Sequence, residues 1–269
     1  MLLLIDAKQA THRAYHIAGL SYMNQHTNVL YGVLNSTLSL VDFFSPDVLV
    51  FCWDSKKSLR KEVYPEYKAN RRKSGKDYTS LWQQESQLKD IIPQLGWNQF
   101  GAIEGLEADD LIANICHQSD DQIIIVSNDS DMYQLLDKKI SMYFPIKKEL
   151  FTANDFIFKY RIDPNMWVLK DAIAGTHNNI KGVKGIGEKK TLDYLRRGIE
   201  SKYAKMIDDQ FSLWEPNIKL IELPYRKVKM PEWKDLTINI DMFIDICQLY
   251  SFKSFIKQIN KWKEVFNGK

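Results

Sequence analysis

The sequence lacks the features that mark secreted, disulfide-stabilised and membrane-spanning proteins. It holds only three cysteines, Cys52, Cys116 and Cys247, an odd number without the spacing of a zinc site. No apolar run approaches the roughly 20 residues that cross a bilayer, and the first residues do not form a signal peptide. Internal repeats and low-complexity segments are also missing. We therefore expect a cytoplasmic protein of a bacterium or a phage-infected cell, with reduced thiols and no membrane association.

Basic residues are concentrated in two stretches, although the net charge of the 269 residues is only +3. Residues 56–76 contain nine Lys/Arg and two Glu, and residues 181–205 contain eight Lys/Arg and three acidic residues. The rest of the chain therefore carries a net charge of −9. Two basic stretches in an otherwise acidic chain suit a polyanionic partner. A single Lys/Arg run, however, is equally typical of a solvated surface.

Acidic side chains follow three hydrophobic stretches that are typical of buried strands. The pairs are residues 2–5 with Asp6, residues 48–53 with Asp54, and residues 123–128 with Asp129 and Asp131. A fourth acidic group opens an expected helix and comprises Glu107, Asp109 and Asp110. Because ligands bind at the carboxyl ends of parallel strands, we expect these acids to hold a hard divalent cation, Mg²⁺ or Mn²⁺. Taken singly, each acid could instead form a turn, cap a helix or favour a helix N-terminus.

The order of elements predicts an α/β fold with a central, mostly parallel sheet flanked by helices. A helix over residues 31–44 would join the first two strands as a right-handed crossover. Further elements are expected as helices at 79–92 and 109–118, a strand near 139–144, and helices at 154–160 and 164–171. We expect a core over residues 1–165 and a helical C-terminal subdomain over residues 166–269.

A glycine-rich turn precedes another expected helix. Gly182, Gly185 and Gly187 allow a tight turn and a close approach of the backbone to a ligand. Four lysines surround the turn, namely Lys181, Lys184, Lys189 and Lys190. Together with the amide groups at the helix N-terminus they could bind a phosphate, although a glycine turn between helices is also a common structural element.

Taken together, these motifs resemble the 5′-nuclease family, which includes flap endonucleases, bacteriophage 5′→3′ exonucleases and the 5′-nuclease domain of bacterial DNA polymerase I. The matching segments, in the family's order, are Asp6 with residues 12–16, Asp54 with Arg60 and residues 64–71, residues 107–110, residues 127–131 and residues 182–187. They extend over nearly the whole chain. Each segment is weak evidence alone, but their joint order is highly specific.

The resemblance implies a two-metal phosphodiesterase. The implied metal ligands are Asp6, Asp54, Glu107, Asp109, Asp129 and Asp131, with Asp110 as a direct ligand or an outer partner. Lys68 and Arg71 would stabilise the scissile phosphate. The implied DNA contacts are Arg13, Arg60, Tyr67 by stacking, and Lys181, Gly182, Lys184, Gly185, Gly187, Lys189 and Lys190. A helix–turn–helix would lie at about residues 170–197, and the backbone carbonyls of Val183 and Ile186 within it would bind a K⁺ ion. Residues 56–92 would form an arch over a single DNA strand.

The sequence departs from the family just before the glycine turn, where relatives carry Gly-Asp-x-x-Asp-Asn-Ile. Residues 175–180 read Gly-Thr-His-Asn-Asn-Ile, which is one residue shorter and lacks both aspartates. Relatives of the exonuclease IX type lack the same acids. We therefore expect a second ion to bind weakly or only together with substrate.

The expected substrates are DNA with a 5′ flap, a 5′ end or an RNA primer. We expect a monomer, with a replication polymerase or a single-strand binding protein as further partners. Two alternatives stay open. The chain could be a branched-DNA binding protein that lost catalysis, or a small RNase of a related acidic-cluster fold, although such RNases lack the arch and the turn at residues 182–187.

Overall fold

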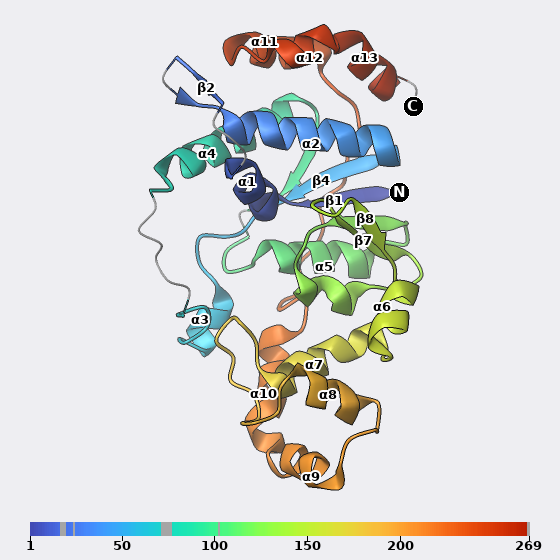
Figure 1. Ribbon diagram of the computed structural model, residues 1–269. Helices are drawn as coiled ribbons and strands as arrows, with labels where there is room; N and C mark the ends of the chain where they lie inside the picture. Colours follow the sequence, from blue (N-terminus) through green and yellow to red (C-terminus); the bar gives the residue numbers. More distant parts are fainter. Residues whose placement is uncertain (17–19, 24, 71–76, 102, 268–269) are drawn as a thin grey trace. The chain divides into compact units, whose positions relative to one another are not determined.

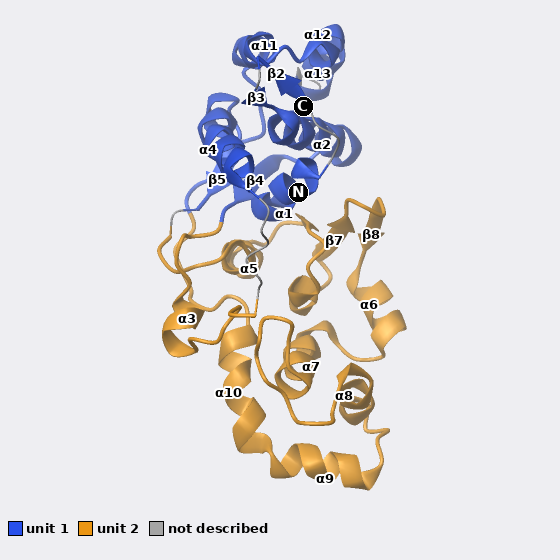
Figure 2. Cartoon of the chain, turned by 60° about the vertical axis from the view of Figure 1, so that its left-hand side comes forward, with its two compact units in different colours: residues 1–53, 75–101, 231–269 blue, residues 54–74, 102–230 orange. Residues whose placement is uncertain are grey.

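The computed structural model describes residues 1–16, 20–23, 25–70, 77–101 and 103–267 (Figure 1). The chain forms two compact units, one of residues 1–53, 75–101 and 231–269, the other of residues 54–74 and 102–230 (Figure 2). This division differs from the expected boundary at residue 165, because the C-terminal segment 231–269 belongs to the same unit as the N-terminal strands.

The first unit is built on three parallel strands in the order β5-β4-β1. They are β1 (Leu2–Asp6), β4 (Val48–Cys52) and β5 (Asn98–Phe100). All of β1 and nearly all of β4 is buried, which explains why both read as continuous apolar runs. The segment between them contains α1 (Ala7–Tyr15), β2 (Ser21–Tyr22), β3 (Gln25–His26) and α2 (Asn28–Phe44). The expected parallel pair with a helical crossover is therefore confirmed.

Helix α2 packs against α1, α4 (Thr79–Gln94) and α13 (Ile259–Asn267) of the first unit. α4 continues through Pro93, where the sequence predicted its end. The C-terminal segment also contains α11 (Ile240–Leu249) and α12 (Lys253–Lys257).

The second unit contains the parallel pair β6 (Ile123–Val126) and β7 (Ile140–Phe144), with β8 (Glu149–Phe151) antiparallel to β7. β5 and β8 were not predicted, because three residues are too few to show a pattern of alternation. The helices of this unit are α3 (Leu59–Val63), α5 (Ala108–Gln118), η1 (Ser130–Leu135), α6 (Ala153–Tyr160), η2 (Pro164–Met166), α7 (Trp167–Ala174), α8 (Glu188–Leu195), α9 (Ser201–Asp209) and α10 (Phe211–Ile221).

The predicted fold class, a mostly parallel sheet flanked by helices, is confirmed. In the second unit α7 packs against both α8 and α10. A buried apolar cluster unites these helices with the glycine turn and includes Ile173, Val183, Ile186 and Trp214. Over the described ranges, no helix combines the length and the apolarity needed to cross a bilayer.

Candidate active site

Asp54 lies at the N-terminus of α5, two residues after the end of β4. Its Oδ1 accepts a hydrogen bond of 2.8 Å from the backbone N–H of Ala108. The first turn of α5 also carries Asp109. Because a helix N-terminus carries partial positive charge, it stabilises the carboxylates gathered there. The second unit thus brings together Asp54, Glu107 and Asp109, as the sequence predicted, at the start of one helix.

Glu107 accepts hydrogen bonds from two side chains of the segment that follows α3. Lys68 Nζ donates to its two oxygens at 2.9 Å and 2.8 Å, and the Tyr67 hydroxyl donates to Oε2 at 3.0 Å. The side chains of Lys68 and Glu107 are 16% and 12% exposed, so this ion pair is largely shielded from solvent. Burial, followed by the charge of Glu107, raises the pKa of the Tyr67 phenol, so that it remains a donor. Lys68 therefore lies directly at a candidate metal ligand.

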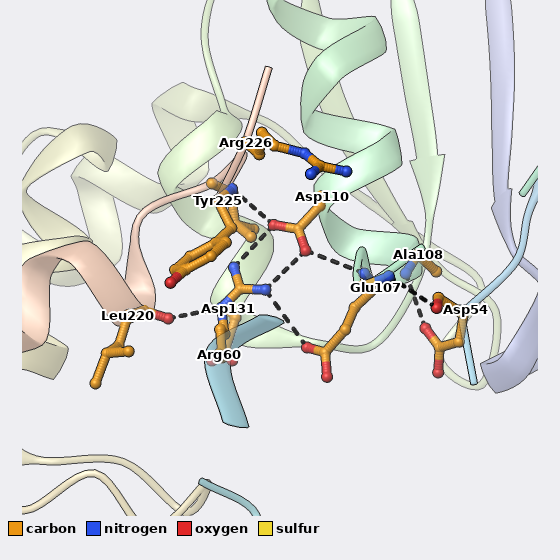
Figure 3. Close-up of polar contacts among 12 residues, drawn as sticks. Asp54, Arg60, Glu107, Ala108, Asp110, Asp131, Leu220, Tyr225 and Arg226 are labelled. Atoms are coloured by element: carbon orange, nitrogen blue, oxygen red, sulfur yellow. Dashed lines mark hydrogen bonds and ion pairs between the residues drawn. The ribbon is translucent and has the colours of Figure 1, made fainter. Parts of the chain in front are cut away.

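Arg60 and Asp110 form a fully buried ion pair beside this group (Figure 3). The guanidinium donates to the two Asp110 oxygens at 2.7 Å and 2.8 Å, and its Nε donates to the carbonyl of Leu220 at 2.7 Å. The backbone N–H groups of Glu107 and Tyr225 also donate to Asp110. Asp110 therefore fixes the start of α5, since donors occupy both of its oxygens.

Two expected DNA contacts need correction. Arg60 is 2% exposed and bound to Asp110, so its guanidinium has no face to offer a phosphate. Tyr67 is 4% exposed, and its ring belongs to the apolar cluster around Val183 and Ile186. A base cannot stack on a buried ring, and the hydroxyl of Tyr67 donates to Glu107 instead.

Asp129 and Asp131 follow β6 in a tight turn that leads into η1. The N–H of Asp131 donates to Oδ1 of Asp129 at 3.0 Å, and the amide of Asn178 donates to Oδ2 of Asp131 at 3.3 Å. Burial raises the pKa of Asp131 to about 7, with further contributions from the negative charges of Asp129 and Asp171. The charge of Lys68 acts in the opposite direction and lowers this pKa.

Asn178 contacts this group of residues, although it was not among the predicted site residues. Its side-chain amide donates to Asp131, and its backbone carbonyl oxygen accepts a hydrogen bond of 2.8 Å from the backbone N–H of Lys68. Lys68 has a φ of 56°, a left-handed conformation that is strained for a lysine. The only signal in the sequence was that residues 175–180 are short and lack acids where relatives carry them.

The oxygen donors in the second unit fit a hard divalent ion, although they do not form a ready-made site. Among the residues that the structure describes, no three acidic, histidine or cysteine side chains are arranged to hold a metal ion. Lys68 pairs with Glu107 and Arg60 pairs with Asp110, so these two carboxylates already have cationic partners.

The glycine turn, residues 182–187, joins α7 to α8. The absence of a side chain serves a different purpose at different glycines of this turn. A Cβ on Gly182 would lie 2.3 Å from backbone atoms of Ala174 and Gly175, so Gly182 is required by internal packing. Gly185 has a φ of 81°, and a Cβ there or on Gly187 would meet no atom within 4 Å. These two glycines therefore expose backbone to the outside.

The lysines around this turn are also not equivalent. Lys184 and Lys189 are exposed, whereas Lys190 donates to the carbonyl of Gly185 at 3.0 Å and packs on the Tyr203 ring. Lys181 forms an exposed ion pair with Glu66. The carbonyl of Val183, one of the two expected K⁺ ligands, accepts the N–H of Ile186 at 3.0 Å within the turn.

Of three other predicted residues, two belong to the first unit and the third is not described. Asp6 belongs to the first unit, where it is buried and caps α1 by accepting the N–H of Gln9 at 3.0 Å. Arg13 is half-buried in the last turn of the same helix. Arg71 lies outside the described residues, as do residues 72–76 of the expected arch.

Comparison with known proteins adds sequence and structural relatives. Residues 1–161 match the family described as 5′-3′ exonuclease, N-terminal resolvase-like domain. The 5′-3′ exonuclease of Mycoplasmopsis pulmonis is 30% identical over 72% of this chain and 65% of its own length. DNA polymerase I of Thermus aquaticus is 29% identical over 80% of this chain but only 28% of its own length. The chain thus spans less than two thirds of either relative.

Solved structures share the fold over nearly the entire chain. The T5 D15 protein, co-crystallized with metal ions, has a TM-score of 0.68 at 24% identity and covers 97% of this chain and 98% of its own. Flap endonuclease-1 from Methanococcus jannaschii has a TM-score of 0.68 at 16% identity and covers 99% of this chain and 93% of its own. At these identities the likeness concerns the fold.

Proposed function

Because this chain belongs to the 5′-3′ exonuclease family, we propose that it is a Mg²⁺- or Mn²⁺-dependent nuclease that hydrolyses phosphodiester bonds near a 5′ end or at a 5′ flap. The observation that carries the proposal is the placement of Lys68 on Glu107, which puts a cationic side chain at a candidate metal ligand. A bound divalent ion would supply an activated water and charge stabilisation at the phosphate.

Within this proposal the acids have distinct tasks. Asp54, Glu107 and Asp109 are the ligands offered by the start of α5, and Asp129 and Asp131 are those offered by the end of β6. Asp6 is proposed as a further ligand from the end of β1. Lys68, together with Arg71, would stabilise negative charge on the scissile phosphate, since both are cationic side chains of the segment after α3.

The glycine turn is proposed to grip duplex DNA. The open backbone at Gly185 and Gly187 precedes the N-terminus of α8, where unpaired amide groups favour a phosphate. Exposed Lys184 and Lys189 add positive charge at the same place. We also propose that a K⁺ ion bridges this turn to the phosphate through the carbonyls of Val183 and Ile186, and that Arg13 contacts a phosphate.

The proposed substrates are DNA with a 5′ flap, a free 5′ end or an RNA primer. The T5 D15 flap endonuclease, whose fold this chain shares, has been solved as a complex with DNA and metal ions. Substrates of this kind arise in replication and repair, so a polymerase or a single-strand binding protein is proposed as a functional partner.

A second candidate function is branched-DNA binding without efficient cleavage. It is favoured by Asn178, an amide where relatives carry a carboxylate, since an amide oxygen holds Mg²⁺ less firmly than a carboxylate. The retained Asp54, Glu107 and Lys68 oppose it, because buried charges are costly unless they are used.

A labelled 5′-flap duplex distinguishes the two candidates. The wild type should cleave it when Mg²⁺ or Mn²⁺ is present and not in a chelator, and Asp54→Ala should lower the rate by about 100-fold or more while keeping duplex affinity. Cleavage that persists in the chelator, or a wild type that binds the flap but does not cut it in millimolar Mn²⁺, would reject the nuclease assignment.

A further inference from the structure

The segment that replaces the family's aspartate loop is a closed turn in this chain. Gly175 and Lys181 form an antiparallel bridge, and the N–H of Thr176 donates to the carbonyl of Ile180 at 2.9 Å. Asn179 adopts a left-handed φ of 66° within the turn. We refer to residues 175–181 as the asparagine loop.

The asparagine loop is tied to the segment that carries Lys68 by contacts that involve four of its residues. They are Lys68 N to the carbonyl of Asn178 (2.8 Å), Asn179 Nδ2 to the carbonyl of Glu66 (2.8 Å), Tyr64 Oη to the carbonyl of Asn179 (3.2 Å), Asn70 Nδ2 to the carbonyl of His177 (3.1 Å), and the ion pair Lys181–Glu66 (3.2 Å). The loop and the segment 64–70 are therefore held as one piece of structure.

Asn178 is the one residue of this loop that also reaches the acids after β6. Its side chain is buried, with 5% exposure for the residue, and its amide donates to Asp131. Its carbonyl holds the backbone of Lys68, whose Nζ lies on Glu107. A continuous chain of contacts thus runs from Asp131 through Asn178 and Lys68 to Glu107.

We propose that Asn178 is a positioning residue whose amide holds Asp131 in the place where relatives use a second-site ion and its carboxylates. The amide offers partial positive charge to a largely buried carboxylate without adding a negative charge of its own. A carboxylate at position 178 would face Asp131 and Asp129 together, and three such groups need a cation. The inference rests on the proposed function, because that function makes Asp131 a metal ligand.

The test is Asn178→Asp in the full chain without DNA, with Mn²⁺ as the probe. The variant should unfold at a lower temperature than the wild type in a chelator, because a donor is lost and a charge is added. The affinity for the Mn²⁺ ion that is bound most weakly should be about tenfold higher in the variant than in the wild type. Electron paramagnetic resonance of free Mn²⁺ measures this affinity. Saturating Mn²⁺ should then restore its unfolding temperature.

Two further variants control for folding and for general charge effects. Asn154→Asp makes the same chemical change at an exposed position of α6 and should alter neither Mn²⁺ binding nor metal-free stability. Asp131→Asn combined with Asn178→Asp exchanges donor and acceptor across the same contact. This exchange should recover most of the metal-free stability that Asn178→Asp loses, and it should abolish the tighter Mn²⁺ binding.

The inference is overturned if Asn178→Asp binds Mn²⁺ as the wild type does, or if the exchanged pair is no more stable than Asn178→Asp alone. Should Asn178→Asp fail to fold in the chelator, the exchanged pair decides the matter, because it restores the contact without adding net charge. A wild type that never cleaves DNA would remove the proposed function while leaving these metal and stability readouts interpretable.

Discussion

Glu107 and Asp110 lie three residues apart on the chain and yet have different surroundings. Glu107 is partly exposed and pairs with Lys68, which is partly exposed as well, whereas Asp110 is enclosed with Arg60 at no measurable exposure. A buried ion pair of this kind is difficult to break from one side, because the remaining charge is left without compensation. At the scale of single residues, Glu107 is therefore suited to exchange partners and Asp110 to keep them.

Replacing Arg60 tests this distinction. Arg60→Met should lower the free energy of unfolding by about 3–5 kcal/mol, because Asp110 remains buried and charged. Arg60→Met with Asp110→Leu should recover part of that loss in urea denaturation, because the unpaired charge is removed but the N–H groups of Glu107 and Tyr225 lose their acceptor. Lys57→Ala, which removes an exposed ion pair with Glu104, serves as the control and should leave stability unchanged. If Arg60→Met kept full stability but weakened DNA binding, Arg60 would be a DNA contact after all.

Asp131 predicts how metal-free stability changes with pH. Its pKa of about 7 in the folded chain, caused first by burial, lies above the value near 4 of an unfolded aspartate. The stability that the protonated Asp131 carboxyl group contributes is therefore fully present below about pH 4, and it is lost as the pH rises to about 7. In a chelator the wild type should lose roughly 1–3 kcal/mol relative to Asp131→Asn between about pH 5 and pH 8. Parallel pH curves of thermal unfolding for the two proteins would contradict this.

The glycine turn shows how one element can contain two kinds of glycine. Gly182→Ala should destabilise the chain by roughly 3 kcal/mol or more, because the new Cβ would overlap backbone at 2.3 Å. Gly187→Val should keep wild-type stability, since that position is open and its φ of −98° suits valine. It should nevertheless weaken duplex binding several-fold by blocking the N-terminus of α8. Fluorescence anisotropy with a duplex checks this, and unchanged affinity for Gly187→Val would exclude the turn from binding.

The elements themselves show what the sequence could and could not predict. β1, β4 and β6 were predictable because each is a buried apolar run that ends at an acid or is followed by one within three residues. The start of α5 was predictable because acids cluster there. The burial of Arg60 was not, because its partners Asp110 and Leu220 lie 50 and 160 residues away and come together only on folding. The burial of Tyr67 was not predictable either, because the motif that contains it is also typical of an exposed aromatic residue on which a base stacks.

At the scale of the whole molecule, sequence order and compact units do not coincide. Residues 231–269 return to the unit that contains β1, and residues 54–74 join the unit that contains α5. The acids Asp54 and Glu107 thereby enter one unit together with Lys68. A boundary placed at a change of composition could not reveal this, because the return of the C-terminal segment depends on packing.

The uneven charge of the whole chain predicts strongly salt-dependent DNA binding. Lys/Arg-rich stretches lie at residues 56–76 and 181–205, while the rest of the chain is net acidic. Lys184→Ala with Lys189→Ala should lower the slope of log affinity against log salt by about 2, since each phosphate contact contributes about 0.9. Lys139→Ala with Lys261→Ala, which removes exposed lysines that lie outside both stretches and are paired with Asp120 and Asp42, is the matched control. Equal slopes for both double variants would reject the glycine turn as the basic DNA contact.

The central claim is that the carboxylates around Lys68 capture a divalent ion. Calorimetric titration of Mn²⁺ into the DNA-free wild type and into Glu107→Gln tests it most directly. The wild type should bind at least one ion, and Glu107→Gln should bind it about tenfold or more weakly while remaining folded. A wild type that takes up no Mn²⁺ in the millimolar range, or a Glu107→Gln protein that binds it equally well, would contradict the account.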